Sequence, residues 1–295
     1  MSNIMLTGGT GFLGSHLLKG ILKKTEYGII LLKRSTSDVF RIKNELKNKR
    51  LMYYDIDKIP LNEIFYACPP EIIIHSATNY GRDNENITEI VGANLTLPLN
   101  LLQLGADNGL KCFINTDTVI DKRITFYSKS KKQFLDWLTE YANTVKCINL
   151  RLEHFYGAGD NKTKFVSFII QSLINNIPSI ELTEGKQKRH FIHVEDVVRA
   201  FLCILSSIDT VTDGFSSFDV STEKSITIKK FVMLARDLTG NLTTNLDFGA
   251  IPYRNGELMD IKTDISALNA LGWKPQISLE DGLKIVIQQE RKQVL

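Results

Sequence analysis

The sequence predicts an α/β protein with a doubly wound parallel sheet of the Rossmann type and a smaller C-terminal lobe. Three observations predict this fold. Short apolar stretches alternate with amphipathic helical patterns in the first half, a glycine-rich loop follows the first of these stretches, and the alternation weakens after about Asp160. Parallel strands are buried on both faces, so they are expected to be apolar along their whole length.

The strand candidates are short and lack strict alternation of apolar and polar residues, which favours buried parallel strands over surface strands. They are Asn3–Thr7, Ile29–Lys33, Arg50–Tyr53, Glu71–His75, Lys111–Asn115 and Val145–Leu150. Apolar residues at helical spacing predict helices over Phe12–Lys24 and Glu85–Asn108. Alternating strands and helices are typical of a doubly wound sheet.

In the second half the predicted strands become shorter and the loops longer. Helical patterns cover Lys164–Asn176, Glu195–Ser207 and Thr227–Thr239. We therefore expect a dinucleotide-binding Rossmann domain over residues 1–163, to which segments near 191–221 return. Residues 164–295 then form a substrate-binding lobe that covers the ligand.

Composition excludes several classes of protein. The chain has 295 residues, 43% of them hydrophobic, which is enough for a sizeable core, and a net charge of +3 that does not favour nucleic-acid binding. No apolar run approaches the roughly 20 residues that span a bilayer, and the first strand begins too early for a signal peptide. The cysteines lack metal-ligand spacing, so we expect a cytoplasmic chain without metal and with reduced cysteines. They are Cys68, Cys112, Cys147 and Cys203.

The glycine-rich loop TGGTGFLG links the first strand to the first helix. Its glycines, three residues apart, allow a tight turn, a close approach of backbone N–H groups to a pyrophosphate, and close packing of helix on strand. The start of the helix adds a partial positive charge. The loop predicts dinucleotide binding by Gly8, Thr10, Gly11, Phe12, Leu13 and Gly14.

The end of the second strand indicates which dinucleotide binds. An NAD site usually has an acidic residue there, whereas this chain has Lys33, Arg34 and Ser35. Cations and hydroxyl groups hold a 2′-phosphate, so we predict NADPH; the alternative is a solvated surface loop. After the third strand, Asp55 and Ile56 are expected near the adenine, although Asp55 is also suited to cap the next helix.

A YxxxK pair, Tyr127 and Lys131, opens a predicted helix that follows the fifth strand. Residues four apart lie on one helical face, where an ammonium group stabilises a tyrosine phenolate. Thr116 ends the fifth strand, whose carboxyl end faces the cofactor crevice, and its hydroxyl is suited to bind the reacting oxygen. The three residues are predicted to be catalytic, with Tyr127 and Lys131 also touching the cofactor; the alternative for Lys131 is a solvated helix face.

These motifs resemble the extended short-chain dehydrogenase/reductases that act on nucleotide sugars, the NAD-dependent epimerase/dehydratase family. The resemblance covers the whole chain. It implies cofactor contacts at Ser76, Ala77 and Asn94. It also implies that His154 replaces a substrate-binding Asn of the family's R-x-x-N-x-Y-G segment. Further substrate contacts implied by matching segments are Arg189, Arg254 and Glu257.

Narrower stretches resemble the CDP-abequose and CDP-paratose synthases. They are LRLEHFYGAGD, NYGRDNE, KFVSFII and FGAIPYRNGELM. This resemblance implies NADPH-dependent reduction of the 4-keto group of a CDP-4-keto-3,6-dideoxyhexose, in the making of O-antigen sugars. Reductases of dTDP- or CDP-4-keto-6-deoxyhexoses are the alternative. Thr118 stands where the related 4,6-dehydratases have a glutamate base, which argues against dehydration.

The two phosphates of a nucleotide sugar require cations, and Arg189 and Arg254, supported by Lys164, are the leading candidates. Tyr80 and Arg82 follow the fourth strand and are predicted either to overhang the sugar or to lie on the surface. Asp117 either contacts a sugar hydroxyl or shapes a turn.

Two rival functions remain. One is an epimerase that keeps NAD bound, against which the Lys33 and Arg34 pair weighs; the other is a non-catalytic dinucleotide sensor, which usually lacks the Tyr or the Lys. The resemblance further implies a homodimer, in which the helices Glu85–Asn108 and Tyr127–Ala142 pair with their copies.

Overall fold

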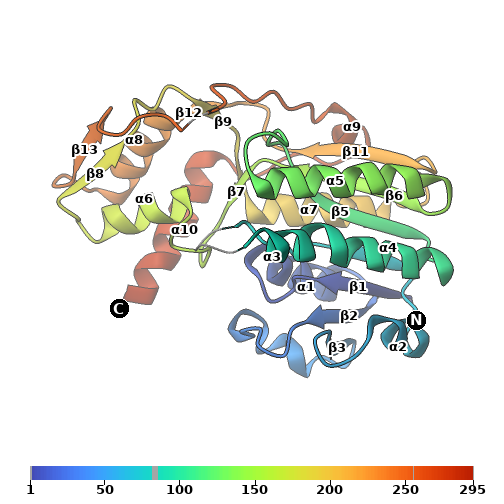
Figure 1. Cartoon of the computed structure of the whole chain (residues 1–295). Helices are drawn as coiled ribbons and strands as arrows, with labels where there is room; N and C mark the ends of the chain where they lie inside the picture. Colours follow the sequence, from blue (N-terminus) through green and yellow to red (C-terminus); the bar gives the residue numbers. More distant parts are fainter. Residues whose placement is uncertain (1, 82–85, 255, 295) are drawn as a thin grey trace. The chain divides into compact units, whose positions relative to one another are not determined.

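The computed structural model describes residues 2–81, 86–254 and 256–294 (Figure 1). The chain forms two compact units, and each unit is made of two separate stretches of the sequence. Unit 1 comprises Met1–Leu152 and Val198–Phe218, and unit 2 comprises Glu153–Val197 and Asp219–Leu295. None of the helices in the described part of the chain is long and apolar enough to cross a membrane.

Unit 1 is built on the parallel sheet that the sequence predicts. The strand order is β11-β6-β5-β4-β1-β2-β3, and every pairing from β3 to β6 is parallel. Chain order reverses between β1 and β4, the position at which doubly wound proteins bind ligands. The strands are β1 (Asn3–Thr7), β2 (Gly28–Lys33), β3 (Leu51–Asp55), β4 (Ile72–His75), β5 (Cys112–Thr118), β6 (Lys146–Leu152) and β11 (Phe215–Val220).

Helices pack on both faces of this sheet (Figure 1). On one face, Met5, Ile73 and Phe113 of the strands meet Leu101 of α4 and Phe134 of α5 in a buried core. On the other face, α1 contacts β1 and β2. The α-helices here are α1 (Phe12–Lys24), α2 (Leu61–Ala67), α3 (Ile87–Val91), α4 (Leu97–Asp107), α5 (Phe126–Glu140) and α7 (Val194–Ser206), the last of which runs on from unit 2.

One π-helical turn, η3 (Gly92–Thr96), joins α3 to α4, so that residues 87–107 form one continuous helical segment. A π turn holds one residue more than an α turn and is frequent at functional sites. Three short 3₁₀ turns complete the unit, η1 (Phe40–Ile42), η2 (Glu45–Lys47) and η4 (Tyr141–Asn143).

Within the described residues, unit 2 consists of three two-stranded sheets and four α-helices of its own. β7 (His154–Tyr156) is parallel to β10 (Phe191–His193), β8 (Ser179–Leu182) is parallel to β13 (Asn245–Phe248), and β9 (Lys188–Arg189) is antiparallel to β12 (Ile226–Thr227). The helices are α6 (Phe165–Ile174), α8 (Ile228–Thr239), α9 (Ser266–Ala270) and α10 (Leu279–Val294).

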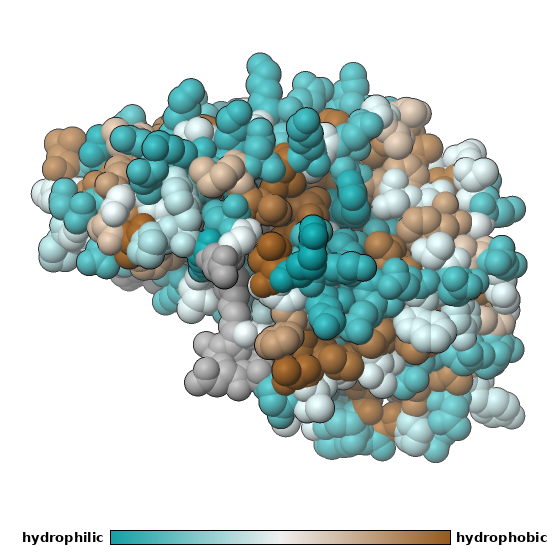
Figure 2. Space-filling view, turned by 45° about the horizontal axis from the view of Figure 1, so that its top comes forward, coloured by the Kyte–Doolittle hydropathy of each residue, from teal (hydrophilic) through white to brown (hydrophobic). Residues whose placement is uncertain are grey.

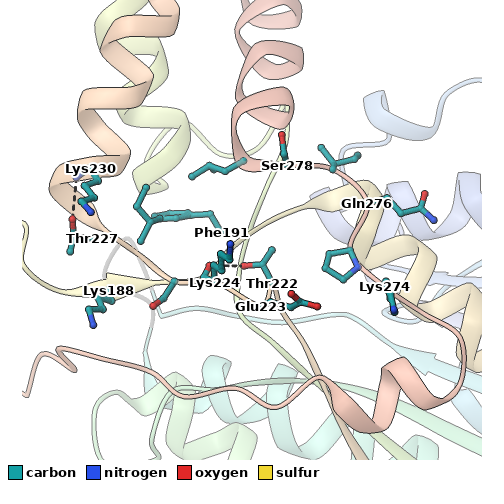
Figure 3. Close-up of a pocket in the computed structure, with 15 residues that line it drawn as sticks. Lys188, Phe191, Thr222, Glu223, Lys224, Thr227, Lys230, Lys274, Gln276 and Ser278 are labelled. Atoms are coloured by element: carbon teal, nitrogen blue, oxygen red, sulfur yellow. Dashed lines mark hydrogen bonds between the residues drawn. The ribbon is translucent and has the colours of Figure 1, made fainter.

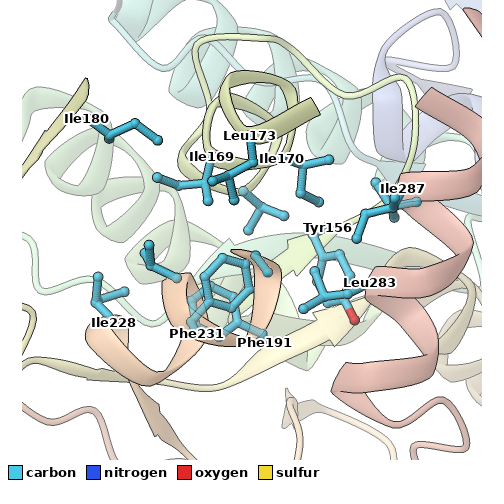
Figure 4. Packing of buried hydrophobic residues seen from close by; sticks show 14 of the residues in the cluster. Tyr156, Ile169, Ile170, Leu173, Ile180, Phe191, Ile228, Phe231, Leu283 and Ile287 are labelled. Atoms are coloured by element: carbon cyan, nitrogen blue, oxygen red, sulfur yellow. The ribbon is translucent and has the colours of Figure 1, made fainter. Parts of the chain in front are cut away.

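The core of unit 2 is a compact apolar cluster (Figure 4). Phe191 stacks on Phe231 with ring centroids 4.1 Å apart. Ile170 of α6 and Leu283 and Ile287 of α10 pack in the same cluster, so the last helix supplies part of the core. The buried carboxylate of Asp196 accepts hydrogen bonds from two backbone N–H groups of residues 276–277, which fixes the segment that leads into α10.

Several sequence predictions can now be compared with the structure. Within the described residues, all six predicted strands and all six predicted helices are present, with ends that differ by a few residues. The sequence did not indicate α2, the strand β11 or α10. Cys112 and Cys147 are packed in unit 1, where burial raises the pKa of each thiol to about 12, so both are protonated at neutral pH.

Candidate functional site

The candidate site of unit 1 lies at the carboxyl edge of the parallel sheet. Thr7, Lys33, His75 and Thr116–Thr118 are the last residues of β1, β2, β4 and β5. Because neighbouring strands run in the same direction, these ends meet at one edge, on both sides of the point where strand order reverses. Most of the residues that the sequence analysis assigned to the cofactor and to catalysis in unit 1 lie on this edge or in the loops that leave it.

The glycine loop has the shape that a dinucleotide pyrophosphate requires. Gly8 has a φ of +70°, and a Cβ there would lie 2.6 Å from the Ala77 nitrogen; a Cβ at Gly14 would lie 2.0 Å from the Gly8 carbonyl oxygen. Only glycine therefore fits these two positions. Gly11 caps α1 without any side-chain hydrogen bond, and the first turn carries no acidic residue. The N–H groups at the start of a helix are suited to bind a phosphate group.

A hydrogen-bonded cluster around Thr7 joins β1 to the segment after β4. The Thr7 hydroxyl oxygen accepts bonds from the Ser76 and Ala77 N–H groups and lies 2.9 Å from His75 Nδ1. Since its two lone pairs are used, the hydroxyl donates to Nδ1, and the imidazole proton is on Nε2. Burial lowers the pKa of His75 well below its usual value, so this imidazole is neutral. The cluster holds Ser76 and Ala77 beside the glycine loop.

The end of β2 differs from the expected phosphate site in its details. Lys33 and Asp55 are register partners on β2 and β3, and their side chains form an ion pair. The Ser35 hydroxyl and N–H both donate to the Asp57 carboxylate. Arg34 is exposed, and its guanidinium has no partner among the residues that the structure describes. The Arg34 side chain is therefore the cation that is most available to an anion at this edge.

Helix α5 begins one residue before Tyr127. Thr125 caps the helix by accepting a bond from the Ser128 N–H, and the Ser128 side chain accepts one from the Thr125 N–H. This reciprocal capping box fixes the first turn, which carries Tyr127. The Tyr127 ring lies beside that of Tyr80, with centroids 5.0 Å apart. Arg82, which was predicted with Tyr80, lies outside the described residues.

Lys131 joins the YxxxK pair to the end of β5. It is buried, and its ammonium group donates to the Thr116 carbonyl oxygen at 2.9 Å, while the Thr116 hydroxyl donates to the His75 carbonyl oxygen at 2.9 Å. Tyr127 lies one helical turn before Lys131 on the same face of α5. Burial lowers the pKa of Lys131 to about 8. Lys131 and Thr116 are therefore in contact at the end of β5, and Tyr127 precedes Lys131 by one turn of α5.

Asp117 is part of a buried polar network in the sheet. Its carboxylate accepts from Lys132 Nζ at 2.6 Å and from Asn149 Nδ2 at 3.1 Å, and Asn149 accepts from Asn115. Its side chain is fully buried, so it lies in the protein interior in this structure. The sequence analysis did not identify Lys132 or Asn149. The sequence does contain features that indicate both residues: Lys132 directly follows the lysine of YxxxK, and Asn149 is a polar residue inside an apolar strand.

Asn94 occupies the π turn and is fully buried. Its side-chain NH₂ group donates to the Asn79 carbonyl and to the Ser130 hydroxyl, and its oxygen accepts from the Asn79 N–H and the Thr78 hydroxyl. These four bonds use its whole capacity. Asn94 therefore connects the segment after β4 to α5, and it has no remaining donor or acceptor for a cofactor.

In unit 2, Arg189 is held against the segment around Glu257. Its guanidinium pairs with the Glu257 carboxylate and donates to the carbonyl oxygens of Leu258 at 2.7 Å and Lys188 at 2.6 Å. Arg254 is exposed, and its side chain has no partner within the described part of the chain. Glu257 is therefore the ion-pair partner of Arg189 in this structure.

The remaining candidates of unit 2 lie on β7 and before α6. His154 Nδ1 lies 2.9 Å from the carboxylate of the buried Glu153, and its ring meets Phe191 edge to face. Lys164 pairs with Asp160 at 3.1 Å and lies over the Phe155 ring. Both polar side chains are thus oriented by acidic neighbours that the sequence analysis did not consider.

The fold and the glycine loop define a dinucleotide-binding protein of the Rossmann class, and comparison identifies the family. A model described as the NAD dependent epimerase/dehydratase family matches residues 4–215. The chain belongs to this family. It is similar to the UDP-glucose 4-epimerase structure of Thermotoga maritima, with a TM-score of 0.84 and 24% identity over 99% of this chain and 100% of that one. At this identity the likeness shows the fold alone.

Two curated relatives are similar over almost their full length. CDP-abequose synthase of Salmonella muenchen is 34% identical over 290 residues, which cover 95% of each chain. dTDP-4-dehydro-6-deoxyglucose reductase of Escherichia coli is 26% identical over 98% of each chain.

Proposed function

We propose that this protein is an NADPH-dependent reductase of the 4-keto group of a nucleotide-activated deoxyhexose, of the CDP-4-keto-3,6-dideoxyglucose type. The observation that carries the proposal is the contact of Lys131 with Thr116 at the edge of the sheet where strand order reverses, with Tyr127 one helical turn before Lys131 on α5. The similarity to CDP-abequose synthase supports the choice of substrate class. Thr118, in place of an acidic base, supports reduction rather than dehydration.

Side chains of the protein donate the proton that this reaction requires and stabilise the charge that remains. When NADPH is bound, it supplies the hydride. Tyr127 donates its phenolic proton to the oxygen of the former keto group, and the Lys131 ammonium group stabilises the phenolate that remains. The Thr116 hydroxyl, which now donates to the His75 carbonyl, turns to the same oxygen. Lys131 uses one proton on the Thr116 carbonyl, which leaves two N–H donors for the phenolate and the cofactor ribose.

NADPH is favoured over NADH by the charge at the end of β2. Lys33 is already paired with Asp55, and the Ser35 hydroxyl with Asp57, so neither is the main ligand of a 2′-phosphate. We assign that role to Arg34, whose planar guanidinium suits a phosphate group. Lys33 holds Asp55 and offsets its negative charge near the adenosine.

For the nucleotide of the substrate we assign Arg254 and Arg189 in unit 2. Arg254 has no partner among the described residues and is available to a diphosphate. Glu257 and two carbonyl oxygens orient Arg189, which leaves one Nη2 hydrogen and the Nε hydrogen for the ligand. Lys164 and His154 supply further polar contacts on the same unit. Asn94, by contrast, acts as a positioning residue for the segment that carries Tyr80.

The deciding experiment measures NADPH oxidation with CDP- and dTDP-4-keto sugars and identifies the product by NMR. We expect turnover with a CDP-4-keto-3,6-dideoxyhexose and a product reduced at C4. Tyr127→Phe should lose at least about a hundredfold in kcat, within the range attributed to general acid catalysis, and keep its NADPH affinity. A Phe variant with most of the wild-type rate would remove Tyr127 from this role. Activity without added NADPH, from tightly retained NAD, would indicate an epimerase.

We also propose a homodimer through the helical segment 87–107 and α5. Phe126 and Trp137 are eleven residues apart on α5, which places them on one side, and both are about half exposed, as is Ile87 of α3. α3 and α5 contact each other within unit 1. Figure 2 shows one face of the molecule, on which brown hydrophobic areas lie among teal hydrophilic ones. Large exposed apolar side chains that share one helical side favour a protein partner.

The dimer is tested by the molecular mass in solution. Trp137→Glu should convert a dimer to a monomer in light scattering after gel filtration, because it puts a charge into an apolar interface. Tyr66→Glu is the matched control, since Tyr66 is 91% exposed on α2, which is not one of the proposed interface helices, and should leave the mass unchanged. A monomeric wild type would refute the proposal.

A further inference from the structure

Unit 2 contains a cavity of about 730 Å³. Three segments line it: β9 and β10, residues 222–230 up to the first turn of α8, and residues 274–279 that lead into α10 (Figure 3). None of the residues assigned to the cofactor, to catalysis or to the substrate is among its lining residues. The cavity therefore requires an explanation of its own.

The lining combines an apolar floor with a basic rim. Phe191, Ile226, Ile277, Leu279 and Pro275 supply the apolar surface. Figure 3 shows four lysines around it, and the one acidic residue in the described lining is Glu223. The lysines are Lys188, Lys224, Lys230 and Lys274.

Three of these four lysines are not neutralised by any residue that the structure describes. Lys188 lies 3.6 Å from Asp260, but Lys224, Lys230 and Lys274 have no ion-pair partner in the described ranges. The Thr227 hydroxyl accepts a bond from the Lys230 N–H, which leaves its own proton free to donate into the cavity. Several unpaired ammonium groups around one cavity attract an anion that carries more than one negative charge.

The size of the cavity narrows the choice of anion. Sites for small organic molecules usually measure about 300–1,000 Å³ and are mostly apolar with a few polar groups, as this one is. A single inorganic phosphate would leave the apolar floor uncovered and most of the lysines unpaired. We propose that the cavity is a second nucleotide site, which takes a nucleoside diphosphate. The base and ribose lie on the apolar floor, and the phosphates lie between Lys224, Lys230 and Lys274. This inference does not rest on the proposed function.

The rate of lysine acetylation, measured by mass spectrometry, tests where the nucleotide binds. The full chain, saturated with NADP⁺, is acetylated with and without CDP. At a CDP concentration ten times its Kd about a tenth of the sites stay free, so Lys224, Lys230 and Lys274 should react about tenfold more slowly. Lys229 is the internal control, because it is adjacent to Lys230 but lies over the Phe248 ring and does not line the cavity. Unchanged rates at the three cavity lysines would overturn the proposal.

Calorimetry with a matched pair of variants tests the stoichiometry. Lys224→Ala/Lys274→Ala should bind one CDP fewer per chain than the wild type. The control Lys229→Ala/Lys262→Ala changes two lysines that do not line the cavity and should bind the wild-type number. An equal number in all three proteins would refute the second site. Inorganic pyrophosphate that protects the cavity lysines as well as CDP does would refute a nucleotide ligand. Both double variants should keep wild-type turnover. Turnover therefore tests the proposed reductase activity, and the number of CDP molecules bound tests the second site, so either proposal can fail without the other.

Discussion

At the residue scale, the ammonium group of Lys131 connects stability to pH. Burial lowers its pKa from 10.5 to about 8, so the unfolded chain binds this proton more tightly than the folded one. The group therefore destabilises the fold by about 3 kcal/mol at pH 7, and this penalty disappears as pH rises from about 8 to 10.5.

Lys131→Met tests this penalty. Met fills the space without a charge but loses the hydrogen bond to Thr116, which costs about 1 kcal/mol. We expect the variant to be about 2 kcal/mol more stable than the wild type in urea unfolding at pH 7, and to lose that advantage near pH 10.5. A difference that does not change with pH would contradict the assignment. The variant should be inactive at both values.

The same pKa predicts how activity depends on pH. As pH rises through about 8, Lys131 loses the proton that stabilises the Tyr127 phenolate, so kcat should fall above that pH. Lys131→Arg retains the positive charge at all these values and should move the fall to higher pH. A thermal unfolding scan of the variant shows whether the larger group is accommodated. An unchanged alkaline limb in a folded Arg variant would show that another group controls it.

Arg34 determines cofactor choice in our proposal. Arg34→Ala should raise the KM for NADPH by about tenfold to a hundredfold, the equivalent of one or two charge-assisted hydrogen bonds, and leave the KM for NADH nearly unchanged. Arg41→Ala, in the same loop region, is the control. Equal changes in the KM for both cofactors would show that Arg34 does not bind the 2′-phosphate.

Residue types were predictable from the sequence, whereas their partners were not. Thr116, Tyr127 and Lys131 were predicted because the proposed chemistry requires them at a fixed place after a strand. The pairing of Ser35 with Asp57, and of Arg189 with Glu257, joins residues 22 and 68 positions apart. Such pairs depend on how strands and loops meet in three dimensions, and a single sequence does not record that.

At the scale of elements, the capping box of α5 supports the proposed chemistry. Thr125→Ala removes the acceptor for the Ser128 N–H, which should cost about 1 kcal/mol and loosen the turn that carries Tyr127. We expect kcat to fall more than the affinity for NADPH. Thr125→Ser keeps the hydroxyl and should restore both. If Ser and Ala behave alike in steady-state kinetics, the cap has no part in placing Tyr127.

The elements of unit 1 were more predictable than those of unit 2. Buried parallel strands give apolar runs that alternate with helices, and each run marks one strand. The strands of unit 2 have two to four residues and pair in three separate sheets, which leaves no periodic pattern to detect. The π turn at Gly92–Thr96 was also not predictable, because tertiary contacts of Asn94 select it rather than its local sequence.

At the scale of the whole molecule, the packing of α10 tests how unit 2 is held together. A Cβ at Gly282 would lie 2.1 Å from the Tyr156 hydroxyl oxygen of β7. Gly282→Ala should therefore destabilise the protein by about 1–3 kcal/mol, as overpacking does, measured by urea unfolding. Gly92→Ala is the control, because nothing lies within 4 Å of a Cβ there. Equal stability of the two variants would show that α10 can shift without cost.

The contribution of α10 to the core has a consequence for how the protein is made. Leu283, Val286 and Ile287 are the last residues of the unit 2 cluster to be translated, and they pack against side chains that begin at Tyr156. The ribosome must therefore produce all of the intervening chain, including the part that belongs to unit 1, before this core can close. Until then the apolar faces of α6 and α8 remain open to chaperones. A premature stop codon ahead of Leu283 would leave them exposed permanently.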